Sequence, residues 1–284
     1  MSSEQKMNKK KFWRKENIIG FSMIAVAALF FMPIYYMLIN AIKPNKEVLL
    51  RTIEFPKGLY LDSFITIWQK TSFLNLLKNS VIITVLSIIG IVLFSSMAGY
   101  MIARKNTRFT KTVYLYLLLS IVIPFQAIMI PLVKLMAFLH ITNNIYGLVL
   151  VYICAATPMS VFLYAGAVRC IPRSIEEAAR IDGANWFMTF WRIIFPLLRS
   201  ITSTVVILNS FWIWNDFLLP LIMLTSNENK TIPVGLMSLI FGQYGPNVSV
   251  GLAAAIFSVI PMLIIYLSLQ KYFIKGLIEG SVKG

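Results

Sequence analysis

Long stretches without a charged residue constrain the fold of this chain more than any other feature. Five windows contain no Asp, Glu, Lys or Arg: residues 18–42, 81–103, 112–133, 145–168 and 249–270. Each exceeds the roughly 20 residues that an α-helix needs to cross the hydrocarbon core of a bilayer. A sixth window, residues 200–224, is interrupted only by Asp216. We therefore expect a membrane protein.

The apolar windows favour helices over strands. Their hydrophobic residues are continuous rather than alternating, and a helix satisfies its own backbone polar groups inside lipid. Only 13% of the residues are charged, whereas soluble domains have about a quarter. We predict an all-α polytopic membrane protein with six transmembrane helices. The first window is not expected to be a cleaved signal peptide, because it lasts 25 residues and no A-x-A site follows it.

The basic residues predict that both termini lie in the cytoplasm. In this orientation the inner segments hold 18 of the 26 lysines and arginines, as expected when cytoplasmic loops carry the basic excess. The chain then divides into a basic cytoplasmic N-terminus (residues 1–17), a six-helix transmembrane domain (residues 18–270) and a cytoplasmic C-terminal tail (residues 271–284). Contact with anionic membrane lipid accounts for the net charge of +15, so no nucleic-acid partner is expected.

Most of the predicted spans contain proline, which removes a backbone hydrogen bond and tends to kink a helix. The prolines are Pro33, Pro124, Pro131, Pro158, Pro220 and Pro261. They are compatible with bent helices that rearrange around a pathway. They are equally compatible with ordinary membrane helices, in which neighbouring groups satisfy the freed carbonyls.

A polar loop between the fourth and fifth windows, residues 170–199, carries clear helix signals. Ser174 and Glu177 have the spacing of a capping box, and Gly183 suits a left-handed residue after a helix end. We predict helices over residues 175–182 and 185–192, with Pro196 starting the fifth span. A capped helical hairpin on the membrane surface would explain these signals. It would not explain the apolar residues of the loop, which favour docking to a partner: Ala178, Ala179, Ile181, Trp186, Phe187, Phe190 and Trp191.

The same loop resembles a family signature. Glu177-Ala178-Ala179, Gly183 and Ile193-Ile194-Phe195-Pro196 have the spacing of the "EAA…G…I-x-L-P" pattern of the membrane subunits of bacterial ATP-driven importers, with Phe195 in the place of Leu. Ile171-Pro172 and Asp182-Gly183-Ala184 narrow the resemblance to the carbohydrate-uptake branch, the maltose-type permeases. It implies a type I ATP-binding-cassette (ABC) importer permease fold and a coupling loop (residues 170–199) that sits in a groove of an ATPase subunit. The residues implied at this contact are Glu177, Ala178, Ala179, Arg180, Asp182, Gly183, Ile193 and Pro196.

Asp216 is the only ionisable residue well inside a predicted span, and a charge at that depth is a candidate for function. Aromatic faces and amides nearby are groups that a sugar can bind. We therefore expect a translocation pathway or gate formed by Asn209, Trp212, Trp214, Asn215 and Asp216. Two alternatives stay open: aromatic residues also gather at membrane interfaces, and Asp216 could pair with a basic group of a neighbouring helix.

The resemblance extends to the end of the chain and to the partners. Gly276, Gly280, Val282, Lys283 and Gly284 match the G-x-x-x-G-x-V-K-G ending of maltose-type permeases, so Lys283 and Gly284 are implied to reach the ATPase. The resemblance also implies a second homologous permease subunit, two ABC ATPase subunits and an extracytoplasmic sugar-binding protein. It places the chain in the bacterial cytoplasmic (inner) membrane.

The sequence shows no catalytic constellation. It lacks a G-x-x-x-x-G-K-[ST] phosphate loop and has few acidic residues. We expect no catalytic residue, no metal site and no cofactor on this chain, with ATP and Mg²⁺ bound by the partner ATPase. The predicted function is that of a permease subunit for a sugar or oligosaccharide, working by alternating access. An importer for a peptide, polyamine or other small solute is the alternative. A self-sufficient secondary transporter is disfavoured by the absence of repeats, and a membrane enzyme by the missing catalytic set.

Overall fold

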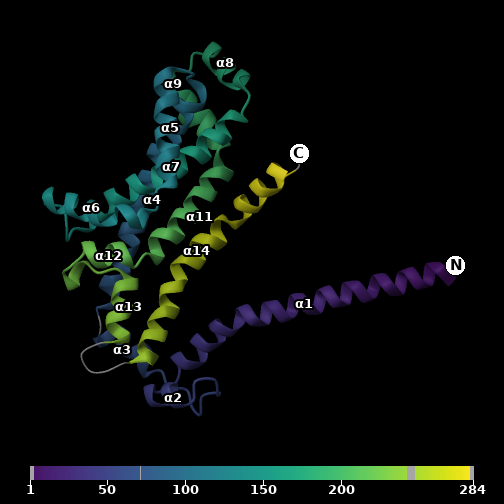
Figure 1. Ribbon diagram of the computed structural model, residues 1–284, viewed down its shortest axis with the longest axis vertical. Coiled ribbons are helices and arrows are strands. Elements are labelled where there is room, and N and C mark those ends of the chain that lie inside the picture. The colour runs from purple at the N-terminus through teal and green to yellow at the C-terminus, as the bar shows by residue number, and fades with distance from the viewer. Residues whose placement is uncertain (1–2, 71, 242–246, 282–284) are drawn as a thin grey trace. The chain divides into compact units, whose positions relative to one another are not determined.

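The computed structural model describes residues 3–70, 72–241 and 247–281, and every regular element in these ranges is a helix (Figure 1). Within the described residues, four helices are long and apolar enough to cross a membrane, and the count reaches six if each of two bent helix pairs is one span. The prediction of an all-α protein is confirmed, and the predicted six spans lie within this range.

Two compact units divide the chain, and each is described by itself. Unit 1 contains residues 1–71 and 239–257. Its helices are α1 (Ser3–Ala41), α2 (Asn45–Leu50), α3 (Asp62–Lys70) and the first turns of α14 (Val248–Ser281). Phe64 and Trp68 of α3 pack edge-on against Phe257 of α14, with ring centroids 5.8 and 5.1 Å apart. These aromatic contacts join α3 to α14 within the unit.

Unit 2 contains residues 72–238 and 258–284. Its long helices are α4 (Phe73–Arg104), α7 (Ile145–Arg169) and α11 (Arg199–Asn215), together with the remainder of α14. The shorter elements are α5 (Arg108–Val122), α6 (Phe125–Phe138), α8 (Arg173–Ile181), α9 (Trp186–Met188), η1 (Thr189–Ile194), α10 (Phe195–Leu197), α12 (Leu218–Met223), η2 (Asn227–Asn229) and most of α13 (Ile232–Ile240).

The core of unit 2 is the contact between α4 and α7. Tyr152 and Tyr164 of α7 are fully buried, as is Ile91 of α4. At Gly99 the two backbones approach so closely that an added Cβ would lie 2.7 Å from the Tyr164 Cβ. Small residues at a helix contact allow this approach, which matters in lipid because packing rather than the hydrophobic effect drives helix association there.

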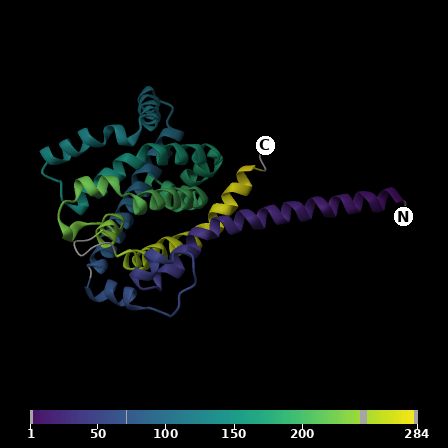
Figure 2. The same ribbon diagram turned by 60° about the horizontal axis from the view of Figure 1, so that its bottom comes forward.

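The predicted third span, residues 112–133, is not one straight helix. It consists of α5 and α6, which meet at 105°; the bend is visible in Figures 1 and 2. Ile123 is extended, with ψ of 120°, and Pro124 follows it. A proline disfavours helical backbone in the residue before it, so the helix ends there.

The predicted fifth span, residues 200–224, is also interrupted. The helix α11 ends at Asn215, Asp216 is extended with ψ of 124°, and α12 starts at Leu218. By contrast, Pro33, Pro158 and Pro261 lie inside the continuous helices α1, α7 and α14. Pro124 therefore marks a break, the break at Asp216 has no proline next to it, and Pro33, Pro158 and Pro261 are accommodated inside helices.

Candidate functional site

The coupling loop begins with α8, which differs from the predicted helix at its start. Helix α8 begins at Arg173, directly after the extended Pro172, and no side chain caps it. Ser174 is thus already inside the helix, so the predicted capping box between Ser174 and Glu177 is wrong. Proline suits this boundary, because it has no N–H to leave unsatisfied at a helix start.

The end of α8 has the predicted geometry. Gly183 has a φ of +86°, in the left-handed region that favours glycine. Its N–H donates to the Arg180 carbonyl (3.0 Å), and the N–H of Ala184 donates to the Ala179 carbonyl (2.9 Å). These two bonds form a Schellman motif, which satisfies the last carbonyls of the helix.

After this turn a second helical segment runs further than predicted. Asn185 caps it by accepting a hydrogen bond from the Met188 N–H (2.8 Å). The segment continues from α9 through the π-helical η1 into α10 at residue 197. Pro196 lies within this last turn, and a 75° bend separates it from α11. The helix of the fifth span therefore starts at Arg199 rather than at Pro196.

The apolar residues of the loop divide into two groups. Phe190 is 3% exposed and packs with Trp191 (centroids 4.9 Å apart) and with Tyr100 of α4 (5.2 Å). Ile181 and Phe187 are 86% and 67% exposed. The buried group packs the loop against α4, so the exposed group is the one available to contact another molecule.

The predicted coupling residues are distributed in the same way. Glu177, Ala178 and Asp182 are exposed, whereas Ala179 is buried. Arg180 lies over the Trp186 ring, 4.4 Å from its centroid.

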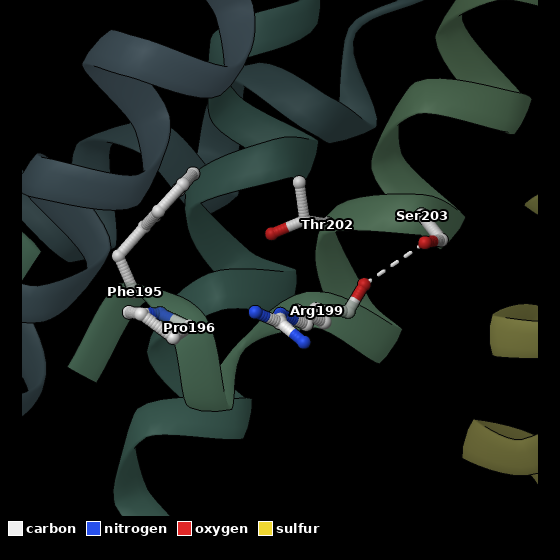
Figure 3. A pocket seen from close by; sticks show the side chains of 5 residues that line it. All are labelled: Phe195, Pro196, Arg199, Thr202 and Ser203. Carbon is white, nitrogen blue, oxygen red and sulfur yellow. Dashed lines mark hydrogen bonds between the residues drawn. The ribbon is translucent and has the colours of Figure 1, made fainter. Parts of the chain in front are cut away.

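Ile193 and Pro196 lie further along, at the base of the loop, where both are half-buried. Pro196 lines an open cavity of about 350 Å³ between α10 and α11, together with Phe195, Arg199, Thr202 and Ser203 (Figure 3). In that view the Thr202 hydroxyl and the Arg199 side chain lie between the two helices, and the Ser203 hydroxyl donates to the Arg199 carbonyl (2.9 Å).

The contacts of Glu176 could not be predicted from the sequence. Its carboxylate forms an ion pair with Arg104, the last residue of α4, at 2.5 Å from Nε to Oε1. The Tyr100 hydroxyl donates to the other oxygen (2.9 Å). The partners lie 72 and 76 residues away in the sequence, so no local pattern predicts these bonds. The one local signal is the spacing of Glu176 and Ala179, which are three residues apart and therefore lie on one face of a helix. In the structure this is the buried face of α8.

Asp216 is held by hydrogen bonds rather than by a basic group. Its Oδ2 accepts from the Tyr152 hydroxyl of α7 (2.8 Å), and its Oδ1 accepts from the Leu218 N–H (3.1 Å). The described part of the chain shows no ion pair to Asp216. Trp212 packs edge-on against Tyr152 and against Phe125 of α6, with centroids 5.4 and 5.7 Å apart.

The other predicted pathway residues lie elsewhere. Trp214 is 5% exposed and donates to the Ser258 carbonyl of α14 (3.0 Å). The Asn209 amide donates to the Ser160 hydroxyl of α7 (3.3 Å), and the exposed Asn215 donates to a carbonyl of its own helix. The structure thus joins Asp216 with Trp212 and adds Tyr152, which the sequence analysis missed. Lys283 and Gly284 lie outside the described residues.

Comparison with known proteins assigns the family. Residues 93–279 match the family described as "Binding-protein-dependent transport system inner membrane component". The melibiose/raffinose/stachyose import permease protein MelC of Bacillus subtilis is 35% identical over 94% of this chain and 96% of its own length. The multiple sugar-binding transport system permease protein MsmG of Streptococcus mutans is 34% identical, with all of both chains covered.

The solved structures agree with this assignment at the level of the fold. A chain from a bacterial ABC transporter involved in the import of the acidic polysaccharide alginate is similar with a TM-score of 0.81, at 23% identity, over 92% of this chain and 97% of that one. The fold is therefore that of an ABC importer permease, as the sequence predicted. With the match over residues 93–279, the chain belongs to the family of inner membrane components of binding-protein-dependent transport systems.

Proposed function

We propose that this chain is a permease subunit of an ATP-driven importer for a sugar or oligosaccharide. The sugar-import functions named for MelC and MsmG, which are similar along nearly the whole chain, support the substrate class. The complex is completed by a second homologous permease, two ABC ATPase subunits that bind ATP and Mg²⁺, and an extracytoplasmic sugar-binding protein. It works by alternating access in the bacterial inner membrane.

One observation supports docking of the ATPase at the coupling loop: the loop exposes some apolar side chains, while others are buried against the rest of unit 2. Ile181, Phe187 and Glu177 are exposed, whereas Phe190 and Ala179 of the same loop are buried. An exposed apolar cluster with a polar rim is the usual composition of a protein contact. Two backbone hydrogen bonds hold the turn at Gly183, and a surface that is ordered before binding lowers the entropic cost of docking.

Two substitutions test the docking. Gly183→Asp places a side chain where φ is +86°, a conformation that costs a non-glycine residue about 1–2 kcal/mol, and Glu177→Lys inverts a charge on the exposed face. Both variants should insert into the membrane and yet lose most sugar uptake. Gly58→Asp is the matched control: Gly58 is exposed, its φ is not left-handed and an added Cβ would meet nothing within 4 Å. Normal uptake in both loop variants would overturn the docking.

The substrate class is tested by reconstituting the complete complex in proteoliposomes and measuring ATP hydrolysis with a panel of oligosaccharides. Stimulation by members of the panel is expected, and none by peptides or polyamines. The chain purified alone should hydrolyse no ATP, since its sequence has no phosphate loop. Stimulation by a peptide or polyamine alone would assign the importer to another solute.

A further inference from the structure

One end of α4 is bonded to the coupling loop through buried charged groups. The side chains of Arg104 and Glu176 are 6% and 4% exposed. Arg104 also donates through Nη2 to the Ile171 carbonyl (2.8 Å), and the Tyr100 hydroxyl satisfies the second carboxylate oxygen of Glu176. The carboxylate is thus fully engaged by α4. A buried ion pair of this kind resists separation, because breaking it would leave an uncompensated charge in the protein interior.

The other end of α4 is bonded to a segment far along the chain. The Asn79 amide donates to the carbonyls of Glu228 (2.6 Å) and Lys230 (3.1 Å). The Ser80 hydroxyl accepts from the Ile232 N–H at 2.9 Å. Residues 228–232, which lead into α13, are therefore tied to the first turns of α4. Figure 1 shows α8 and α13 toward opposite ends of unit 2.

The helix between these two ends is continuous and contains no proline. Among the described helices longer than 20 residues, α4 alone contains no proline; α1, α7 and α14 contain Pro33, Pro158 and Pro261. At 1.5 Å per residue, the stretch from Asn79 to Arg104 is about 37 Å long. Continuous secondary elements are among the structures that carry coupling between distant sites.

We propose that Arg104 and Glu176 are positioning residues that make α4 follow the coupling loop, so that displacement of α8 by the ATPase reaches residues 228–232 at the far end of the helix. This inference rests on the proposed function, because it requires the coupling loop to dock on an ATPase. It assigns to Glu176 a role distinct from that of its neighbour Glu177: Glu177 faces the partner, and Glu176 passes the motion inward.

The test uses the complete complex in proteoliposomes and measures sugar molecules imported per ATP hydrolysed. Glu176→Gln keeps the side-chain shape and removes the charge, so the ATPase should still co-purify and hydrolyse ATP while import per ATP falls at least fivefold. Glu54→Gln is the matched control, because Glu54 forms a pair with Arg51 at 3.2 Å that is solvent-exposed and such pairs contribute little. This control should keep wild-type import per ATP.

Asn79, near the start of α4, allows an independent experiment. Asn79→Ala should lower import per ATP as Glu176→Gln does, although Asn79 lies near the start of α4 and Glu176, in α8, contacts the other end of that helix. If both act on one link, the double variant should be no worse than the more affected single variant, since the link is already broken. Additive losses would overturn the proposal.

A milder variant distinguishes a loss of coupling from a folding defect. Tyr100→Phe removes one hydrogen bond to Glu176 and leaves the ion pair, so it should assemble and show a smaller loss of import per ATP. Wild-type import per ATP in Glu176→Gln, or loss of the assembled complex in both Glu176→Gln and Tyr100→Phe, would overturn the positioning role. If Gly183→Asp abolishes uptake while Glu176→Gln stays coupled, the docking proposal stands and only this inference fails.

Discussion

At the scale of single residues, Asp216 tests the proposed pathway. Its two carboxylate oxygens accept from Tyr152 and from the Leu218 N–H at the break between α11 and α12. Asp216→Ala leaves both donors without a partner, at a cost of about 1–3 kcal/mol each where they are buried. We expect the complex to assemble and uptake to fall, with a smaller effect in Asp216→Asn, which keeps one acceptor oxygen. Co-purification of the second permease, measured beside uptake and ATP hydrolysis, checks this.

The outcomes for Asp216 are distinct. Loss of co-purification in Asp216→Ala, with Asp216→Asn normal, would mean that the residue only holds α11 against α7. Wild-type results in all three measurements would remove Asp216 and Trp212 from the pathway. The basic partner that the sequence left open does not occur among the described residues, so the hydrogen bond from Tyr152 is the contact that a Tyr152→Phe variant should probe.

Local rules predicted some residues of the site and failed for others. Gly183 could be predicted because a left-handed turn at a helix end depends on its immediate neighbours. The bonds of Glu176 could not, because Arg104 and Tyr100 come from another helix. The contact of Trp214 could not be predicted for the same reason: its hydrogen bond to Ser258 of α14 depends on packing between helices.

At the scale of elements, the close approach of α4 and α7 predicts an asymmetry between two glycines. In Gly99→Ala the new Cβ would lie 2.7 Å from the Tyr164 Cβ and 3.0 Å from the Ala165 backbone nitrogen. The backbones must separate, at a cost of about 1–3 kcal/mol for overpacking. Gly166 on α7 meets nothing within 4 Å, so Gly166→Ala should be neutral or stabilising by up to about 1 kcal/mol.

The measurement for these glycines is the temperature at which the detergent-purified chain loses its monodisperse peak. Gly99→Ala should lower it by several degrees, and Gly166→Ala should not. Equal behaviour of the two variants would mean that the α4–α7 contact relaxes without cost and does not determine the stability of unit 2.

Whole elements were easier to predict than their breaks. Each apolar window contains helix, since lipid leaves the backbone few alternatives. The positions of the breaks at Pro124 and Asp216 could not be predicted. A proline within an apolar window breaks a helix at one site and is accommodated at another, and the break at Asp216 has no proline next to it. Pro158 stays inside α7, whereas Pro124 follows an extended residue and ends α5. Neighbouring helices decide between the two outcomes, and they are not visible in a single window.

At the scale of the whole molecule, the number of spans decides which parts of the chain share a side of the membrane. The described helices allow four spans, or up to six if each bent pair crosses once. If α5 and α6 cross once together, four spans precede the coupling loop and it lies on the side of the N-terminus. If they do not cross, three spans precede it and it lies on the opposite side.

The basic residues favour the first arrangement, because each lysine or arginine near an anionic leaflet contributes about 1 kcal/mol and 18 of the 26 then lie on the cytoplasmic side. In the Glu177→Cys variant, we expect the new cysteine to react with a membrane-impermeant maleimide in inside-out vesicles, in which tags at both termini should also be accessible. In the Gly58→Cys variant, the new cysteine should react only in right-side-out vesicles. The exposed Cys154 and Cys170 must first be replaced by serine. Labelling of Glu177→Cys from the same side as Gly58→Cys would show that α5 and α6 form a re-entrant pair and would separate the coupling loop from any cytoplasmic ATPase.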